Sequence, residues 1–451
     1  MTTPFFNPRD FGAKGDGQHL DRAAIQQAVD ACHAVGGGQV LLSAGTYLTG
    51  TIVLKSHVTL VLLEGCELLA SDSEQDYLRA RFYEGIPRYS KEKTALIYAR
   101  HAVHCGVEGR GTINGRDLLF WDELGDKENR DARVHYKTKP WRPFTIAFDR
   151  CQNVHLQNIH IVDSSAYAGW IVECDNVRVQ DVTVQHHFHG PNTDGFHFSS
   201  CHKVFVSGCL FHAGDDCIAV DGNGPAGSSD VVITNCVFET LTNAVRLYTN
   251  LDPVADYDAE IPWGTVQNVS ISNCTVRNSA GVINIVANNG CISRVQVSGL
   301  TVAQELPGTV LFLLTQNGFI NDVDFSHILA TGNGAGAFMG DRPGSIDRLS
   351  LSHCSFGIHP RQKQWALGLP EEIGMYTIYH QAPWTLHFRH THGLRLQHID
   401  MQWNGQDSEI SQPPLLVCQH TRRAKELFSV ADSMSGEYRN GSSHLKAEVL
   451  V

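Results

Sequence analysis

The chain has 451 residues, a formal net charge of −12, 42% hydrophobic residues and only 18% charged residues. Such a chain folds and is not disordered, and the excess of Gly (41) over Pro (16) favours a β-rich protein with many tight turns. The negative charge argues against nucleic acid and anionic membranes as partners. No apolar run reaches the about 18 residues that a membrane-spanning helix needs.

The first element that the sequence predicts is a helix over about residues 20–35. Its expected N-cap is Asp21, and the glycines at 36–38 end it. The apolar residues that recur at helical spacing are Ile25, Ala28, Val29 and Cys32. We expect this helix to cover the open end of a stack of strands, where backbone groups would otherwise stay unpaired.

A repeated segment then organises the chain: a turn residue, an alternating apolar strand and a second short strand. Copies begin at Cys151, Cys174, Cys201, Ser229, Val266, Ile292, Ile320, Ile346 and His392. Most spacings lie between 23 and 28 residues, and no helical pattern separates the strands. The repeat predicts an all-β fold, a right-handed parallel β-helix formed as one domain over residues 1–451. The segment from about 406 to 451 is left unassigned.

The 13 cysteines include no CxxC pair, so neither a disulfide framework nor a zinc site is indicated. Several hold equivalent positions in the repeat, which predicts two ladders in the core: Cys151, Cys174 and Cys201, and Cys209, Cys236, Cys274 and Cys354. We expect no metal and no cofactor. Residues 1–17 show no basic region followed by an apolar run, so we expect a cytoplasmic protein.

Two turn-then-strand segments, "HGPNTDGFHFSS" from His189 and "HAGDDCIAVDG" from His212, carry three acids. Asp194 and Asp215 are 21 residues apart, which predicts side-by-side positions on neighbouring coils. Asp216 follows directly, and a bend at Gly214 is expected to bring both acids to one face. Three close carboxylates repel one another and keep one of them protonated, which suits general acid and base work. The alternative interpretation is ordinary turn chemistry.

With these motifs the sequence resembles the polygalacturonase family, glycoside hydrolase family 28, of the pectate-lyase-like β-helix superfamily. Besides "NTDG" and "GDDC", the segments "FNPRDFGAKGDG", "EGRGTINGR" and "RPFTIAFDRCQNVHLQNIHI" are similar to bacterial members. The resemblance implies an inverting hydrolase with Asp215 as general acid and with Asp194 and Asp216 activating the water. Inversion leads us to expect carboxylates about 6.5–9.5 Å apart.

Two motifs of that family are altered. Where the family has "GHG", one coil beyond "GDD", the chain reads "LTNAVRLYTN". In that strand Arg246 takes the place of the family's first uronate-binding cation, while Tyr248 replaces its lysine. If the position is found by counting coils instead, the family's two uronate-binding cations align with "GVINIVAN", which has no cation. The predicted substrate-binding residues are Asn192, His189, His197, Arg246 and Tyr248, although a single histidine is more often structural.

Four charged and aromatic insertions are expected to wall a pocket, and a pocket favours removal of terminal sugars. They span residues 72–93, 117–144, 251–263 and 358–384. The function predicted is an exo-acting glycoside hydrolase of short pectin-type oligosaccharides. The alternatives are a glycosidase for a neutral sugar, a β-helix lyase or epimerase, and a non-catalytic sugar-binding β-helix. The substrate is the one partner expected, and the oligomeric state is left open.

Overall fold

The computed structural model describes residues 4–81, 92–124, 134–223, 226–249, 264–359, 385–403, 416–419 and 443–450. The chain divides into two compact units, Met1–Ala219 with Ser228–Val232, and Val220–Gly227 with Ile233–Val451. The boundary falls inside two strands, β23 (Ile218–Asp221) and β24 (Ser228–Thr234). Each unit is described by itself, and a single domain stays a prediction. No helix among the described residues has the length and apolarity to cross a membrane.

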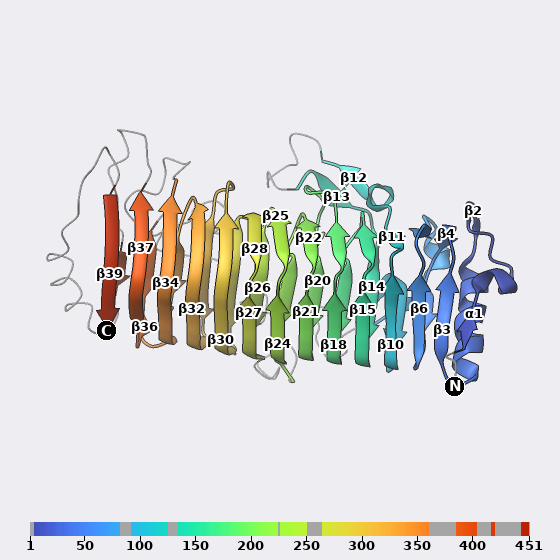
Figure 1. Ribbon diagram of the computed structural model, residues 1–451, viewed down its shortest axis with the longest axis horizontal. Coiled ribbons are helices and arrows are strands. Elements are labelled where there is room, and N and C mark those ends of the chain that lie inside the picture. The colour runs from blue at the N-terminus through green and yellow to red at the C-terminus, as the bar shows by residue number, and fades with distance from the viewer. Residues whose placement is uncertain are drawn as a thin grey trace. The chain divides into compact units, whose positions relative to one another are not determined.

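The N-terminal unit begins with the predicted helix, α1 (Arg22–Ala34), which covers one end of its strands (Figure 1). The expected apolar residues form its buried face: Ala24, Ile25, Ala28, Val29 and Cys32. Asp21 is the N-cap residue, as predicted, but its side chain accepts no hydrogen bond from the helix. Its carboxylate accepts instead from the backbone N–H groups of Lys14 (2.6 Å) and Gly15 (2.9 Å). Asp21 therefore anchors the preceding loop.

Three columns of parallel strands form this unit, and each coil contributes a strand to each column. The first runs β1 (Phe5–Phe6), β3 (Gly38–Leu42), β6 (Val58–Leu62), β10 (Val103–Gly109), β15 (Gln152–Gln157), β18 (Asp175–Gln180), β21 (His202–Ser207). The second runs β2 (Asp16–Leu20), β4 (Gly45–Thr49), β7 (Cys66–Ala70), β11 (Thr112–Asn114), β16 (His160–Val162), β19 (Thr183–Gln185), β22 (Leu210–Ala213). The third runs β5 (Ile52–Leu54), β9 (Lys93–Arg100), β14 (Pro143–Asp149), β17 (Gly169–Val172), β20 (Phe196–Ser199). The short β8 (Arg79–Ala80) pairs antiparallel with β9.

The C-terminal unit repeats the parallel arrangement. One column runs β26 (Asn243–Thr249), β29 (Gly281–Asn288), β31 (Thr309–Gln316), β33 (Gly336–Met339), β35 (Leu386–Arg389), β38 (Leu416–Gln419). A second runs β27 (Thr265–Ser272), β30 (Cys291–Ala303), β32 (Phe319–Gly332), β34 (Ile346–Ile358), β37 (Arg395–Trp403). The remaining strands are β25 (Val237–Thr240), β28 (Thr275–Asn278), β36 (Thr391–His392) and β39 (Ser443–Leu450). The fold is thus the predicted right-handed parallel β-helix.

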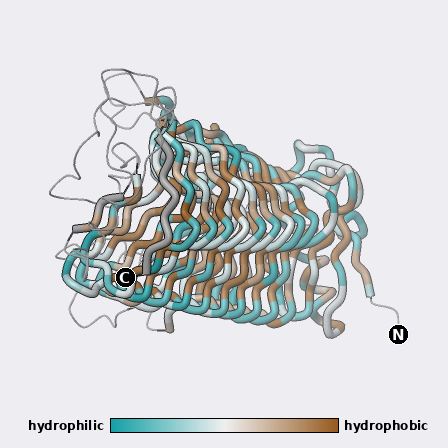
Figure 2. Tube along the Cα trace, turned by 60° about the vertical axis from the view of Figure 1, so that its left-hand side comes forward, coloured by the Kyte–Doolittle hydropathy of each residue, from teal (hydrophilic) through white to brown (hydrophobic). Residues whose placement is uncertain are grey.

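The sequence repeat and the strand register agree. Val154 on β15 pairs with Val177 on β18, and Val177 pairs with Val204 on β21, so equivalent repeat positions stack directly. Within each unit, hydrophobic and hydrophilic positions recur from coil to coil (Figure 2). The expected cysteine ladders are buried and all thirteen thiols are free. In the first ladder the Cys151 N–H donates to Cys174 Sγ at 3.2 Å.

The C-terminal segment, unassigned from sequence, contributes two strands to the described residues. β38 continues the parallel column beside β35, whereas β39 lies antiparallel to β37. The rest of 406–451 lies outside the described residues, as do 82–91, 125–133, 250–263 and 360–384 of the predicted insertions.

Replacing the buried Asp21 by Ala removes the acceptor of two partly buried backbone N–H groups beside α1. The free energy of unfolding should fall by about 1–3 kcal/mol, since unsatisfied buried donors carry their desolvation cost. Urea titration measures this change. Glu64→Ala, at an exposed position, is the control and should stay within about 0.5 kcal/mol of the parent. Equal effects of the two substitutions would contradict the anchoring role.

Candidate active site

The structure brings the three predicted acids together within the N-terminal unit. Asp194 lies just before β20, while Asp215 and Asp216 lie between β22 and β23. One oxygen atom of each carboxylate lies within 4.8 Å of the other two. Asp194 and Asp216 are buried, with 4% and 3% of their surface exposed, and Asp215 is half-buried. Asp215 is therefore the acid that a ligand reaches first.

Backbone hydrogen bonds between neighbouring coils hold these acids in place. Gly195 N–H donates to the carbonyl of Asp216 at 2.9 Å, and Phe196 N–H donates to Cys217 at 3.0 Å. Ahead of them, Gly214 N–H donates to Thr193 Oγ1 at 3.2 Å. The "NTDG" turn thus lies directly on the "GDDC" turn, so the separation of the acids follows from the spacing between coils.

A bend was expected at Gly214, but the structure shows a different reason for having glycine at this position. A Cβ atom at Gly214 would lie 2.4 Å from the carbonyl oxygen of Phe188 and 2.5 Å from Thr193 Oγ1. Its φ is outside the left-handed region. Close approach of the preceding coil, and not an unusual backbone conformation, therefore excludes a side chain here.

Burial and like charge act on Asp194. Desolvation first, then the neighbouring Asp215 carboxylate, raise the pKa of Asp194 to about 8. His197 acts in the opposite direction, with its Nδ1 atom 3.7 Å from Asp194 Oδ2. The acid group consequently holds a proton at neutral pH, which is the state that general acid chemistry requires.

The close contact of the acids does not test the separation expected for inversion. The limit of 4.8 Å applies to the nearest oxygens of the carboxylates, whereas the roughly 6.5–9.5 Å of a water-separated pair applies to whole carboxyl groups. The contact itself follows from the coil repeat, because aligned side chains on neighbouring coils are about 4.8 Å apart. Inversion therefore stays a prediction from the resemblance and does not follow from this distance.

Arg142, which the sequence interpretation missed, supports the "NTDG" turn. Its Nη1 donates to the carbonyls of Ser165 (2.8 Å) and Pro191 (2.6 Å), and its Nη2 donates to Asn192 Oδ1 (2.8 Å). Asp194 and Asp215 both act electrostatically on this guanidinium, although burial lowers its pKa. The only sequence signal was its position in the family-like segment "RPFTIAFDR", directly before β14.

The described part of the 117–144 insertion packs against the segment that carries Asp194. It forms a hairpin of β12 (Trp121–Glu123) and β13 (Tyr136–Thr138), which stands beside β20 and β22 in Figure 1. Trp121 Nε1 donates to the Ser165 carbonyl at 3.0 Å. His135 N–H donates to the His189 carbonyl at 3.0 Å, and the two imidazoles stack at 3.8 Å. This hairpin thus contacts the turn that leads to Asp194, while the expected wall of a pocket stays a prediction.

The five predicted substrate-binding residues fall into two groups. Asn192 is exposed with φ 52°, and His189 is half-buried beside it. His197 lies on β20, buried and facing Asp194. Arg246 and Tyr248 belong to the C-terminal unit, where both are buried and the guanidinium lies 4.8 Å from the Tyr248 ring centroid.

Among the described residues, two groups of side chains bring three possible ligand atoms within 4.8 Å of one another: the three acids, and Asp117, Asp163 and His187. In the second group His187 Nδ1 hydrogen-bonds Asp117 Oδ2 at 2.7 Å. This bond ties the insertion to the coil, and burial raises the Asp117 pKa. Close acids alone do not indicate an ion, so neither group is assigned as a metal site.

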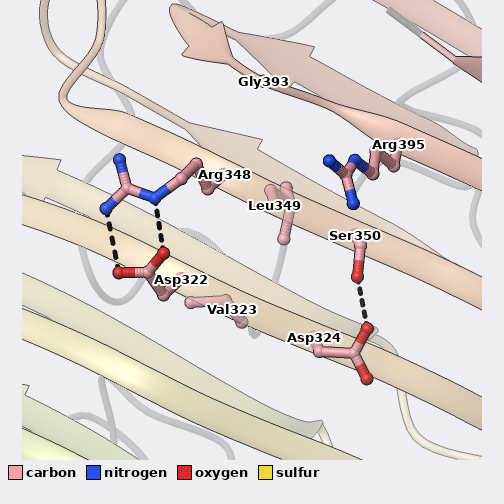
Figure 3. A pocket seen from close by; sticks show the side chains of 8 residues that line it. All are labelled: Asp322, Val323, Asp324, Arg348, Leu349, Ser350, Gly393 and Arg395. Carbon is pink, nitrogen blue, oxygen red and sulfur yellow. Dashed lines mark hydrogen bonds and ion pairs between the residues drawn. The ribbon is translucent and has the colours of Figure 1, made fainter.

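A shallow recess in the C-terminal unit offers no comparable chemistry (Figure 3). Its lining comes from β32, β34 and β37 and the turn before β37: Asp322, Val323, Asp324, Arg348, Leu349, Ser350, Gly393 and Arg395. Arg348 bonds to Asp322 and Ser350 bonds to Asp324, as the dashed lines show. These pairs are typical of a solvated sheet surface.

Gly214→Ala tests whether close approach of the coils sets the acid positions. The added methyl overlaps two oxygen atoms of the preceding coil, so the free energy of unfolding should fall by about 1–3 kcal/mol. Urea unfolding measures it. Gly357→Ala is the matched control, because a Cβ there meets only Thr331 Cγ2 at 3.3 Å and His359 and Ala330 near the edge of contact. Unchanged stability of Gly214→Ala would show that the coils do not restrict this position.

Comparison with known proteins agrees with the fold and the motifs. Residues 32–242 match the family model "Glycosyl hydrolases family 28", a range that includes all three acids. A probable polygalacturonase of Vitis vinifera is 29% identical over 313 residues, covering 65% of this chain and 60% of that protein. An exo-poly-alpha-D-galacturonosidase of Dickeya chrysanthemi is 27% identical over 251 residues, covering 47% and 41%. The chain thus spans only about half the length of these relatives.

Solved structures show the same fold. A family 28 exopolygalacturonase of Yersinia enterocolitica aligns with a TM-score of 0.62 at 16% identity, covering 93% of this chain and 78% of that one. An exopolygalacturonase of Thermotoga maritima aligns with a TM-score of 0.58 at 16% identity, covering 100% and 96%. Residues 32–242, which include the two acid motifs, thus match glycosyl hydrolases family 28, and the solved structures share the parallel β-helix fold.

Proposed function

We propose that this protein is an inverting, exo-acting glycoside hydrolase of short pectin-type oligosaccharides. The observation that carries the proposal is the group of three carboxylates, two buried and one accessible, on adjoining turns. The family match and the names of the relatives, which describe polygalacturonases, support a pectic substrate. A cytoplasmic location is part of the proposal and rests on the sequence.

Exposure suggests how the three acids divide the work. Asp215, the accessible acid, gives its proton to the glycosidic oxygen as the bond from that oxygen to the anomeric carbon breaks. Asp194 and Asp216 orient a water and take one of its protons while the water oxygen bonds to the same carbon from the opposite face. Asp194 must be ionised at that moment. Oxygens of Asp194 and Asp215 lie within 4.8 Å of one another, a gap that a single water can bridge, so the shared proton passes between the two carboxyl groups through that water.

Substrate recognition is proposed for Asn192 and His189, which lie on the turn that carries Asp194 and contact the sugar from that side. Arg246 and Tyr248 belong to the C-terminal unit, and their contact with substrate stays a prediction from the sequence. A neutral sugar is the second candidate, because Tyr248 stands where the family has a lysine.

Asp215→Asn tests the general acid, since the amide retains the shape but has no acidic proton to deliver. The turnover number on oligogalacturonides or aryl glycosides should fall by about 10²–10⁴-fold. Asp122→Asn, at a half-exposed carboxylate on β12, is the control and should keep full turnover. Full activity of Asp215→Asn on every substrate that the wild type cleaves would refute the assignment.

The same assays separate the alternatives. The first product, read by NMR, should have inverted anomeric configuration, and a monosaccharide product identifies exo action. Retention would contradict inversion. Absorbance of an unsaturated uronate would identify a lyase, and binding without any product would identify a sugar-binding protein.

Asp194→Asn should inactivate the enzyme and yet stabilise it. The native pKa of about 8 exceeds the ordinary value of 3.8, so the native wild type binds a proton more tightly than the unfolded chain between these values. Its stability therefore falls as pH rises from about 4 to 8, while that of Asp194→Asn does not. By pH 8 the variant should gain on the order of a few kcal/mol in urea unfolding. Equal pH dependence of both proteins would contradict the raised pKa.

A further inference from the structure

His197 lies between the acid group and an aromatic ring. It is on β20, three residues beyond Asp194, and its Nδ1 atom is 3.7 Å from Asp194 Oδ2. The exposed fractions of the two side chains are 5% and 6%, so this contact is shielded from water. Charged and polar contacts are stronger in such surroundings than at the surface.

Tyr167 fixes the plane of the imidazole. The two rings stack with centroids 4.9 Å apart and an interplanar angle of 24°. Tyr167 also packs edge-on against Trp170, which pairs with His197 in the strand register of β17 and β20. The ring of His197 is thus held on one side by packing while its edge faces Asp194.

Other titratable or charged groups interact with Asp194 or with His197 from the neighbouring elements. They are Asp215 and Asp216 from the turn before β23, Arg142 ahead of β14, Tyr167 ahead of β17 and His186 after β19. The two acids disfavour ionisation of Asp194. His197 is the group on β20 itself that favours it, because a protonated imidazole 3.7 Å away attracts the negative charge of the carboxylate.

We propose that His197 is a positioning residue that helps Asp194 to release the shared proton, so that the proton passes to Asp215 before the glycosidic bond breaks. This role rests on the proposed function and differs from direct contact with the sugar. The proton only changes place between two carboxyl groups, so no further reactant is needed. A buried carboxyl next to another acid otherwise retains the proton itself, and Asp215 would then have none to deliver.

The test compares two substitutions of His197 in the full-length protein. His197→Phe keeps a ring against Tyr167 but has no nitrogen, whereas His197→Asn places a neutral amide donor near the former Nδ1. For His197→Phe we expect the turnover number to fall about tenfold or more and the pH profile of turnover to move upward, with KM changed less than threefold. His197→Asn should give a smaller effect in the same direction.

His155→Phe is the matched control. His155 Nε2 lies 3.6 Å from Glu108 Oε2, nearly the spacing of the His197 pair, but on β15 and β10. This variant should retain the wild-type pH profile. A lower turnover of His197→Phe with an unmoved profile indicates a merely structural role, and a raised KM with unchanged turnover indicates sugar contact. Either result overturns the proposal.

A second measurement does not depend on catalysis. The difference in unfolding free energy between a protein and its Asp194→Asn partner, followed against pH, reports the native pKa of Asp194. In the His197→Phe background this pKa should rise, and an unchanged pKa overturns the proposal. If the wild type cleaves no pectic or neutral glycoside, the proposed function fails, while a raised pKa would still support the coupling of His197 to Asp194.

Discussion

The hydrogen bonds between neighbouring coils are the constraint on which the site depends. In a parallel β-helix each turn lies on the turn before it, and the backbone N–H groups of Gly195 and Phe196 bond to the Asp216 and Cys217 carbonyls. The carboxylates in these turns therefore stay about one coil spacing apart, even though they repel one another. The many bonds of the stack supply the stability that a repulsive group of carboxylates removes, and the rigid frame keeps the acids from moving apart.

The carboxylates are held close together and are buried to different degrees, so their surroundings differ. Asp194 is covered by the coil and by His197, and the Asp215 carboxylate beside it makes ionisation harder. Asp215 lies at the surface of the same group. Two identical side chains thus acquire different proton affinities from their surroundings alone, which is how one fold provides both an acid and a base near neutral pH.

The insertion between β11 and β14 adds a layer that the repeat by itself lacks. Its hairpin places Trp121 against Ser165 and stacks His135 on His189, while Arg142 holds the carbonyl of Pro191. Each contact falls on the turns that lead to Asp194. The insertion therefore holds these turns in place.

The sequence by itself determined the coil. The repeat period, the stacked cysteines, the N-terminal helix and the neighbouring positions of Asp194 and Asp215 all follow from spacing, because a solenoid converts sequence distance directly into position. Only the tertiary structure decided what surrounds the acids. Arg142 comes from an insertion outside the repeat, Asp21 bonds to a loop instead of its helix, and Gly214 is required by a carbonyl of another coil. Contacts of this kind join residues with no fixed spacing, so no periodic pattern predicts them.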